Sequence, residues 1–213
     1  MTQKKPVLEA CVETLDEGIE ACRLGAHQLE VCSRLDLDGL TPGADFVSQL
    51  SASVKVPLKI MIRPREGVFY YTSEEIEGMM ADVINFKAMR IDGFVTGALV
   101  KSEDNQVRVD VNAMIRLCKA AFPFPVTMHK AIDECTDLIR EVQVLRQISN
   151  LHFILTSGGK ATALEGASAL VDMQKAASPS IDVIAAGRIT PDNLPQLKEL
   201  TGLQYFHGRR IVG

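Results

Sequence analysis

Short apolar segments recur along the chain at intervals of roughly 20 to 35 residues, and most of them end in polar or reactive residues. Each interval has room for a loop, a helix and the next strand. Strands that are apolar on both faces are typical of a buried parallel sheet. We therefore expect eight strands, with ends near Cys11, Cys32, Ile62, Thr96, His129, Thr156, Ala185 and His207.

The segments between these strands show the 3.6-residue apolar period of helices. Thr72 followed by Glu75 predicts a capping box at the start of one helix. Thr41-Pro42 and Thr190-Pro191 each predict an N-cap followed by proline in the first helical position. Strands that alternate with helices favour the α/β class.

The repeat predicts an α/β fold, a (β/α)8 TIM barrel that spans residues 1–213 as a single domain. The chain ends six residues after His207, so we expect either a barrel that is incomplete at the eighth helix or a C-terminal segment that is missing from this sequence. Barrels of this kind carry their chemistry at the C-terminal ends of the strands. The irregular segment from Ser33 to Leu40 follows the second strand, and we expect it to lie over that mouth.

Composition narrows the functional class. Of the 213 residues, 46% are hydrophobic and 23% are charged, as in ordinary soluble proteins. The net charge of −4 argues against a general nucleic-acid-binding surface. No apolar run reaches the roughly 20 residues that span a bilayer, and no signal peptide precedes the first strand, so we expect a cytoplasmic protein. Five scattered cysteines predict reduced thiols rather than a disulfide framework.

A doubled Glu-x-Cys pattern ends the first two strands. Side chains alternate along a strand, so Glu9 and Cys11 share one side, as do Glu30 and Cys32. If the two strands are level, their thiols come close together, since neighbouring strands lie about 4.8 Å apart. Two thiolates suit Cu(I), or Zn(II) with further ligands. The alternative is that both cysteines are small buried apolar residues.

Two arginines flank a proline at the end of the third strand. Arg63 and Arg65 could neutralise Glu9 and Glu30 in a buried ion-pair network. Guanidinium groups also bind carboxylate or phosphate in a bidentate manner, so a ligand role remains open beside the structural one.

Histidines follow the fifth and eighth strands. His129, with Lys130 and Asp133 after it, is placed for acid–base chemistry or metal ligation, and Asp133 could orient the imidazole. A histidine that only hydrogen-bonds in the core is the alternative. His207 occupies a similar position at the last strand.

Glycine-containing turns follow the sixth and seventh strands. The backbone N–H groups of Ser157, Gly158, Gly159 and Gly187 could cradle an anion, and Arg188 would add positive charge. Such turns also occur for reasons of backbone geometry alone.

Seven motifs in order resemble the CutC family, which is named for copper homeostasis: Leu8-Glu9-Ala10-Cys11, Leu29-Glu30-Val31-Cys32-Ser33, Gly39-Leu40-Thr41-Pro42, Met61-Ile62-Arg63-Pro64-Arg65, His129-Lys130-Ala131-Ile132-Asp133, Leu155-Thr156-Ser157-Gly158-Gly159 and His207-Gly208. The resemblance implies a cytosolic TIM barrel that is usually a dimer, with Cu(I) ligands that correspond to Cys11 and Cys32. Lys130 stands where arginine is usual, and Ala185-Ala186-Gly187-Arg188 replaces a glycine-rich run.

The principal hypothesis is therefore a cytosolic homo-oligomer that binds Cu(I) through Cys11 and Cys32. The alternative is a lyase, isomerase or hydrolase that acts on a small anionic metabolite at the barrel mouth. In that case Arg63 and Arg188 hold a carboxylate or phosphate, and His129 or Glu30 moves a proton.

The catalytic set is Glu9, Glu30, Arg63, His129 and Asp133, and the anion-binding set is Arg65, Ser157, Gly158, Gly159, Gly187 and Arg188. A scaffold that has lost catalysis is a third alternative. No nucleic-acid or membrane partner is expected.

Overall fold

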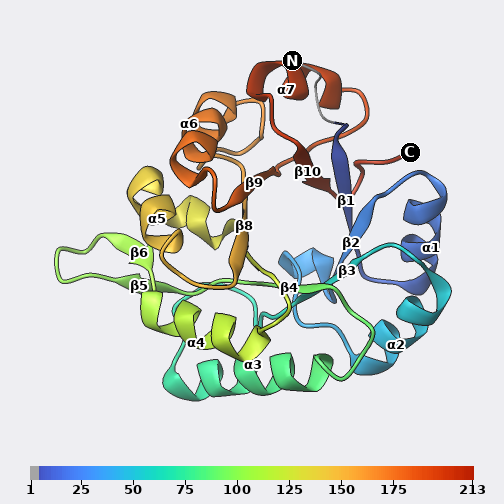
Figure 1. Cartoon of the computed structure of the whole chain (residues 1–213), viewed down its shortest axis with the longest axis horizontal. Helices are drawn as coiled ribbons and strands as arrows, with labels where there is room; N and C mark the ends of the chain where they lie inside the picture. The colour runs from blue at the N-terminus through green and yellow to red at the C-terminus, as the bar shows by residue number, and fades with distance from the viewer. Residues whose placement is uncertain (1–4) are drawn as a thin grey trace.

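The computed structural model describes residues 5–213, which fold around a closed barrel of eight parallel strands. Neighbouring strands follow the order β1-β10-β9-β8-β7-β4-β3-β2 (Figure 1). Their bounds are β1 Val7–Val12, β2 Gln28–Val31, β3 Leu58–Met61, β4 Gly93–Thr96, β7 Val126–Met128, β8 Leu151–Thr156, β9 Asp182–Ala185 and β10 Tyr205–Gly208. The predicted barrel is confirmed, and every strand ends within one residue of its predicted position.

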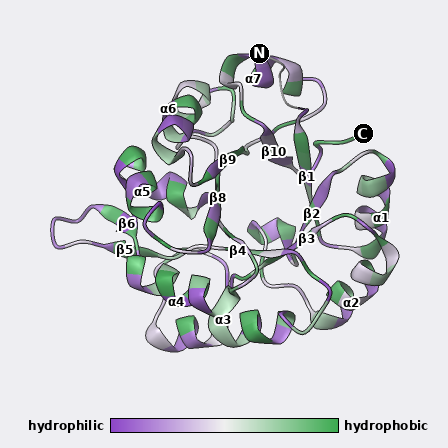
Figure 2. Ribbon diagram, viewed as in Figure 1, coloured by the Kyte–Doolittle hydropathy of each residue, from purple (hydrophilic) through white to green (hydrophobic). Residues whose placement is uncertain are grey.

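Seven α-helices in the described chain surround this barrel (Figure 1). They are α1 Leu15–Arg23, α2 Ala44–Ser53, α3 Ser73–Phe86, α4 Val111–Ala121, α5 Leu138–Leu145, α6 Ala167–Ala177 and α7 Leu194–Thr201. Apolar and polar stretches alternate along them, as expected for helices with one face on the core (Figure 2). None of the described helices is long and apolar enough to cross a membrane.

The helix starts agree only partly with the sequence signals. Thr72 and Glu75 form the complete capping box at α3. The predicted cap at Thr41 is wrong, because α2 begins at Ala44 after Gly43. The Thr41 hydroxyl instead accepts the N–H of Arg63 and donates to its carbonyl. Thr190 also lies before the helix, since Asn193 is the N-cap residue of α7.

Two features have no counterpart in the predicted repeat. A β-hairpin of β5 (Leu99–Lys101) and β6 (Val107–Val109) extends from the barrel between β4 and α4 (Figure 1). Short 3-10 helices, η1 (Leu35–Leu37) and η2 (Lys130–Glu134), follow β2 and β7. After β10, residues 209–213 contain no helix, and the ring of helices is open between α7 and α1 (Figure 1).

Side chains that alternate along each strand divide the core into two regions. Outward residues such as Leu29, Ile60 and Phe94 pack with the helices in one large apolar cluster. Inside the barrel, Cys32, Met61 and Val95 form one small apolar cluster, and Leu155, Ile184 and Ala186 form another. Polar side chains of β1, β2, β3 and β10 occupy the remaining interior, and they position the candidate site.

Candidate functional site

A cavity of about 730 Å³ opens at the C-terminal ends of the strands. The segment around η1 contributes Leu35, Asp36, Leu37 and Asp38, as expected for a loop over the mouth. The predicted site residues that line the cavity are Cys11, Glu30, Cys32, Arg63, His129, Asp133, Ser157 and Gly159. Glu9, Arg65, Gly158, Gly187 and Arg188 are not among the lining residues.

A buried polar network lies next to the thiols, inside β1, β2, β3 and β10. The carboxylate of Glu9 is fully buried and accepts a hydrogen bond from the Gln28 amide at 2.7 Å. The Lys59 ammonium lies 2.9 Å from Glu9 Oε2, and Nδ1 of His207 lies 3.0 Å from Oε1. The same ammonium lies 4.2 Å from the centre of the Phe153 ring.

The predicted ion pairing of Arg63 and Arg65 with the two glutamates is therefore wrong, because Lys59 and His207 provide the positive charge. Lys59 belongs to the apolar strand Leu58–Met61 and points into the barrel. A lysine in the middle of a buried strand is a signal that the sequence contained, since such a charge requires a partner.

Charges within the network set its protonation. Burial alone would raise the pKa of Glu9, but Lys59 and the hydrogen bond from His207 lower it to about 2. Burial and the charge of Glu9 raise the pKa of Glu30. Burial would lower the pKa of His207, but Glu30 and Cys11 raise it well above its ordinary value. The imidazole of His207 therefore carries a proton near neutral pH between two carboxyl groups.

The donor atoms of Cys11, Glu30 and His207 all lie within 4.8 Å of one another. This cluster results from the strand register, which places Cys11 opposite Glu30 and Glu9 opposite both Gln28 and His207. The expected level pairing of Cys11 with Cys32 does not occur, since Cys32 lies two positions further toward the mouth. Sequence analysis identified the two cysteines but not the arrangement of His207 between the two glutamates.

Cys32 is completely buried, whereas Cys11 is half-buried at the cavity. Burial and the nearby Glu30 raise the pKa of the Cys32 thiol well above its ordinary value. Gly39 follows η1 with a φ of +84°, and a Cβ there would lie 3.2 Å from the Cys32 sulfur. A glycine is thus required both by the backbone and by the close approach of this turn to the thiol.

Arg63 is buried on the other side of the cavity and is held by main-chain carbonyls. Its guanidinium donates to the oxygens of Leu37 and Gly39, and to that of Gly67 at 3.2 Å. These bonds connect β3 to the η1 segment over the mouth.

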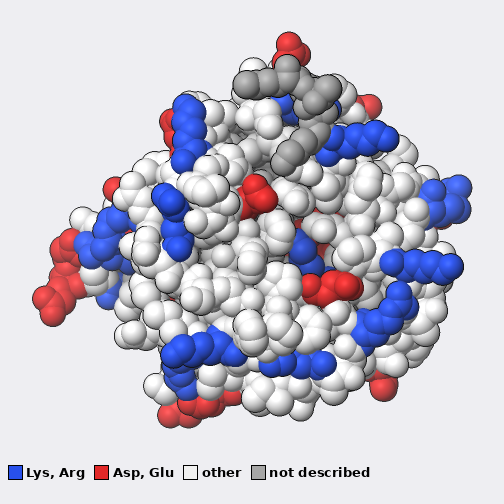
Figure 3. Space-filling view, viewed as in Figure 1, with Lys and Arg blue, Asp and Glu red and all other residues white. Residues whose placement is uncertain are grey.

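The other two predicted arginines lie elsewhere. Arg65 pairs with Glu75 at the start of α3 and does not reach the cavity. Arg188 is exposed in a turn with a φ of +56°. Gly187 packs against Ser157 instead, where a Cβ would lie 3.0 Å from the serine Cβ. Positive and negative side chains are mixed on the molecular face in Figure 3, without a single extended basic patch.

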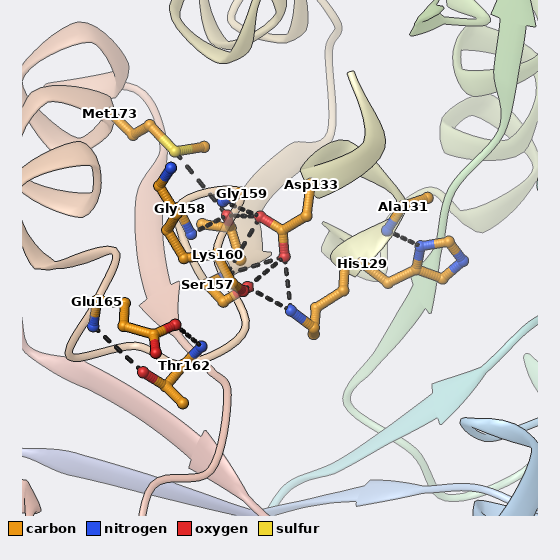
Figure 4. A network of polar contacts seen from close by, with 12 residues as sticks. His129, Ala131, Asp133, Ser157, Gly158, Gly159, Lys160, Thr162, Glu165 and Met173 are labelled. Carbon is orange, nitrogen blue, oxygen red and sulfur yellow. Dashed lines mark hydrogen bonds and ion pairs between the residues drawn. The ribbon is translucent and has the colours of Figure 1, made fainter. Parts of the chain in front are cut away.

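His129 lies at the end of β7, and its ring packs on Phe69 with centroids 5.0 Å apart. Its Nδ1 accepts the N–H of Ala131 at 3.2 Å. Burial and the charge of Arg63 lower its pKa to about 3, so the imidazole is neutral at physiological pH. Asp133 does not orient this ring, contrary to the sequence expectation (Figure 4).

Asp133 instead fills the turn that was expected to hold an external anion (Figure 4). Its carboxylate accepts the N–H groups of Ser157 and Gly159 and the hydroxyl of Thr156. Lys130 pairs with the same carboxylate at 2.6 Å. Burial would raise the pKa of Asp133, but Lys130 and these hydrogen bonds lower it. The N–H groups of the Ser157–Gly159 turn therefore bind the protein's own Asp133 carboxylate and not an external anion.

Comparison with known proteins places this arrangement in a family. The family model of CutC matches residues 6–212. The chain belongs to the CutC family. The resemblance of the seven sequence motifs is thereby confirmed.

CutC proteins from distant organisms align with nearly the whole chain. The family protein CutC of Aliivibrio fischeri is 33% identical over 202 residues, which cover 94% of this chain and 80% of that protein. The human protein named copper homeostasis protein cutC homolog is 35% identical over 202 residues, which cover 94% of this chain and 72% of the human protein. The crystal structure of a CutC protein from Streptococcus agalactiae superposes with a TM-score of 0.88 at 24% identity, covering 97% of this chain and 100% of that one.

Proposed function

We propose that this CutC protein binds Cu(I) at the barrel mouth through Cys11 and Cys32, with His207 as a further donor. The observation that carries the proposal is the convergence of Cys11, Glu30 and His207, whose donor atoms lie within 4.8 Å of one another. Cys32 is outside this cluster but lines the same cavity, with Glu30 and Cys11 as neighbours. Thiolates and imidazole are ligands that copper accepts readily. The human relative is named for copper homeostasis, which favours copper as the cargo.

Several properties of the donor set fit a bound cation. Oxygen Oε1 of Glu30 is buried and has no hydrogen-bond partner among the described residues, so it can face a positive ion. Exposed carboxylates of Asp36, Asp38, Glu66 and Glu134 line the mouth and attract cations from solution. A cysteine, a histidine and a glutamate also suit Zn(II), so zinc is the competing ion to test.

Metal binding must displace protons from the thiols and from the His207 imidazole, because the thiolate and the neutral imidazole are the ligands. The raised pKa of Cys32 means that this thiol is protonated until a metal replaces the proton. All five cysteines are free, in keeping with a reducing compartment. We therefore propose a cytosolic location. The ring of helices, open between α7 and α1 (Figure 1), supports a homo-oligomer in which a second copy covers the gap.

An anaerobic Cu(I) competition titration against a chromogenic chelator tests the proposal. Wild type is expected to bind about one Cu(I) per chain, and the Cys11→Ser/Cys32→Ser variant is expected to lose tight binding because it lacks both sulfur donors. Cys22→Ser is the matched control, since Cys22 lies on the outer helix α1. The same titration with Zn(II) ranks the two ions. Stoichiometric Cu(I) binding that survives in the double variant would contradict the assignment.

A further inference from the structure

Arg63 and His129 contact the same aromatic ring on the cavity wall formed by β3 and β7. The guanidinium carbon of Arg63 lies 4.8 Å from the centre of the Phe69 ring. The imidazole of His129 lies 5.0 Å from the same centre. All three residues line the cavity, and none of them belongs to the Cys11–Glu30–His207 cluster.

His129 offers one unused hydrogen-bond donor. Nδ1 accepts the N–H of Ala131, so the proton of the neutral ring must be on Nε2. The residue is only 4% exposed, and its Nε2 has no partner within residues 5–213. A buried N–H without an acceptor is costly, which implies that an acceptor arrives with a ligand.

Arg63 offers a second unused donor together with a positive charge. A guanidinium has five N–H groups, and three hydrogen bonds to the carbonyls of Leu37, Gly39 and Gly67 leave two without a carbonyl partner. The mostly buried Tyr71 hydroxyl lies close to the same guanidinium. The Nε of Arg63 is buried without a partner in the described chain, and the residue is 4% exposed. Arg63 forms no ion pair with a carboxylate of the described residues. Its charge acts to lower the pKa of Glu134, but that side chain is exposed at the mouth.

We propose that Arg63 and His129 bind the carboxylate of a small organic monoanion, with Phe69 packing against its body. The Nε2–H of His129 and the positively charged guanidinium of Arg63 match a single carboxylate. Leu35, Met61 and Leu155 also line the cavity and provide apolar contact for the rest of the molecule. A volume of about 730 Å³ is typical of small-molecule sites.

This carboxylate site goes beyond Cu(I) binding and uses different residues. It also refines the alternative of an anionic metabolite, since Arg188 is exposed elsewhere and the Ser157–Gly159 turn already holds Asp133. The neutral N–H of His129 would stabilise negative charge on a ligand oxygen without transferring a proton.

Benzoate and its neutral isostere benzamide are suitable probes, because they differ in the group that the site is proposed to recognise. Binding is measured by saturation-transfer NMR titration of the full chain. Benzoate is expected to bind at least about tenfold more tightly than benzamide, as the loss of a charge-assisted hydrogen bond implies. Arg63→Lys and His129→Phe are each expected to weaken benzoate binding by about tenfold or more.

Arg65→Lys is the matched control, because Arg65 ends the same strand but pairs with Glu75 outside the cavity. It is expected to leave benzoate affinity unchanged, since its side chain does not line the cavity. Equal binding of benzoate and benzamide to wild type, or no benzoate binding, overturns the proposal even if the cavity variants fail to fold. An Arg65→Lys effect as large as that of Arg63→Lys also overturns it.

Discussion

Replacing Asp133 by alanine is expected to lower the free energy of unfolding by about 3–5 kcal/mol. The change leaves the N–H groups of Ser157 and Gly159 and the Thr156 hydroxyl without their acceptor. Ser157 and Thr156 are completely buried, so water cannot easily replace the carboxylate. Lys130 is half-exposed and can turn to solvent, so its contribution is smaller.

Urea denaturation followed by circular dichroism measures this loss. Asp172→Ala is the matched control, because Asp172 forms an exposed pair with Lys175 on α6. The control is expected to change the free energy of unfolding by no more than about 0.5 kcal/mol. If Asp133→Ala costs no more than the control, Asp133 does not stabilise the turn in the way described.

Glu9→Gln is the second substitution with a large expected effect, a loss of about 3–5 kcal/mol in the free energy of unfolding. The neutral amide leaves the buried Lys59 ammonium and the protonated His207 without their shared carboxylate. Adding Lys59→Met removes one of the unpaired charges, so the double variant is expected to recover part of the lost stability. A double variant that is less stable than Glu9→Gln alone would contradict this account of the network.

The same variant tests the pH dependence of folding. The pKa of Glu9 is about 2 in the folded chain, against an ordinary value of 4.5. A lowered pKa means that the stability from Glu9 is complete above about pH 4.5 and is lost as the pH falls toward 2. The pKa of Glu30 is raised, so its contribution to the pH dependence of stability has the opposite sign. Urea titrations across this range should show a shallower acid loss for Glu9→Gln than for wild type.

The barrel could be predicted because its strands are short apolar runs with polar ends, and local pattern determines both features. The location of the cavity followed from the fold, since Cys11, Glu30, Arg63 and His129 end their strands on one side of the barrel. These positions required no knowledge of how the strands pair.

Partner choice inside the barrel could not be predicted in the same way. Strand stagger places Cys11 opposite Glu30 rather than Cys32, and this register is set by closure of the whole barrel. Lys59, and not Arg63, is the partner of Glu9, because a long side chain can cross the interior from a strand that is otherwise apolar. Asp133 turns toward Ser157 instead of His129, and only the path of η2 decides between them.

Copper K-edge X-ray absorption of the protein loaded with Cu(I) tests the central claim most directly, because it identifies the atoms bound to the metal. The account predicts two sulfur neighbours in wild type, fewer in Cys11→Ser and in Cys32→Ser, and no change in Cys22→Ser. A copper environment of nitrogen and oxygen alone, or a sulfur count unchanged by both cavity variants, would contradict it.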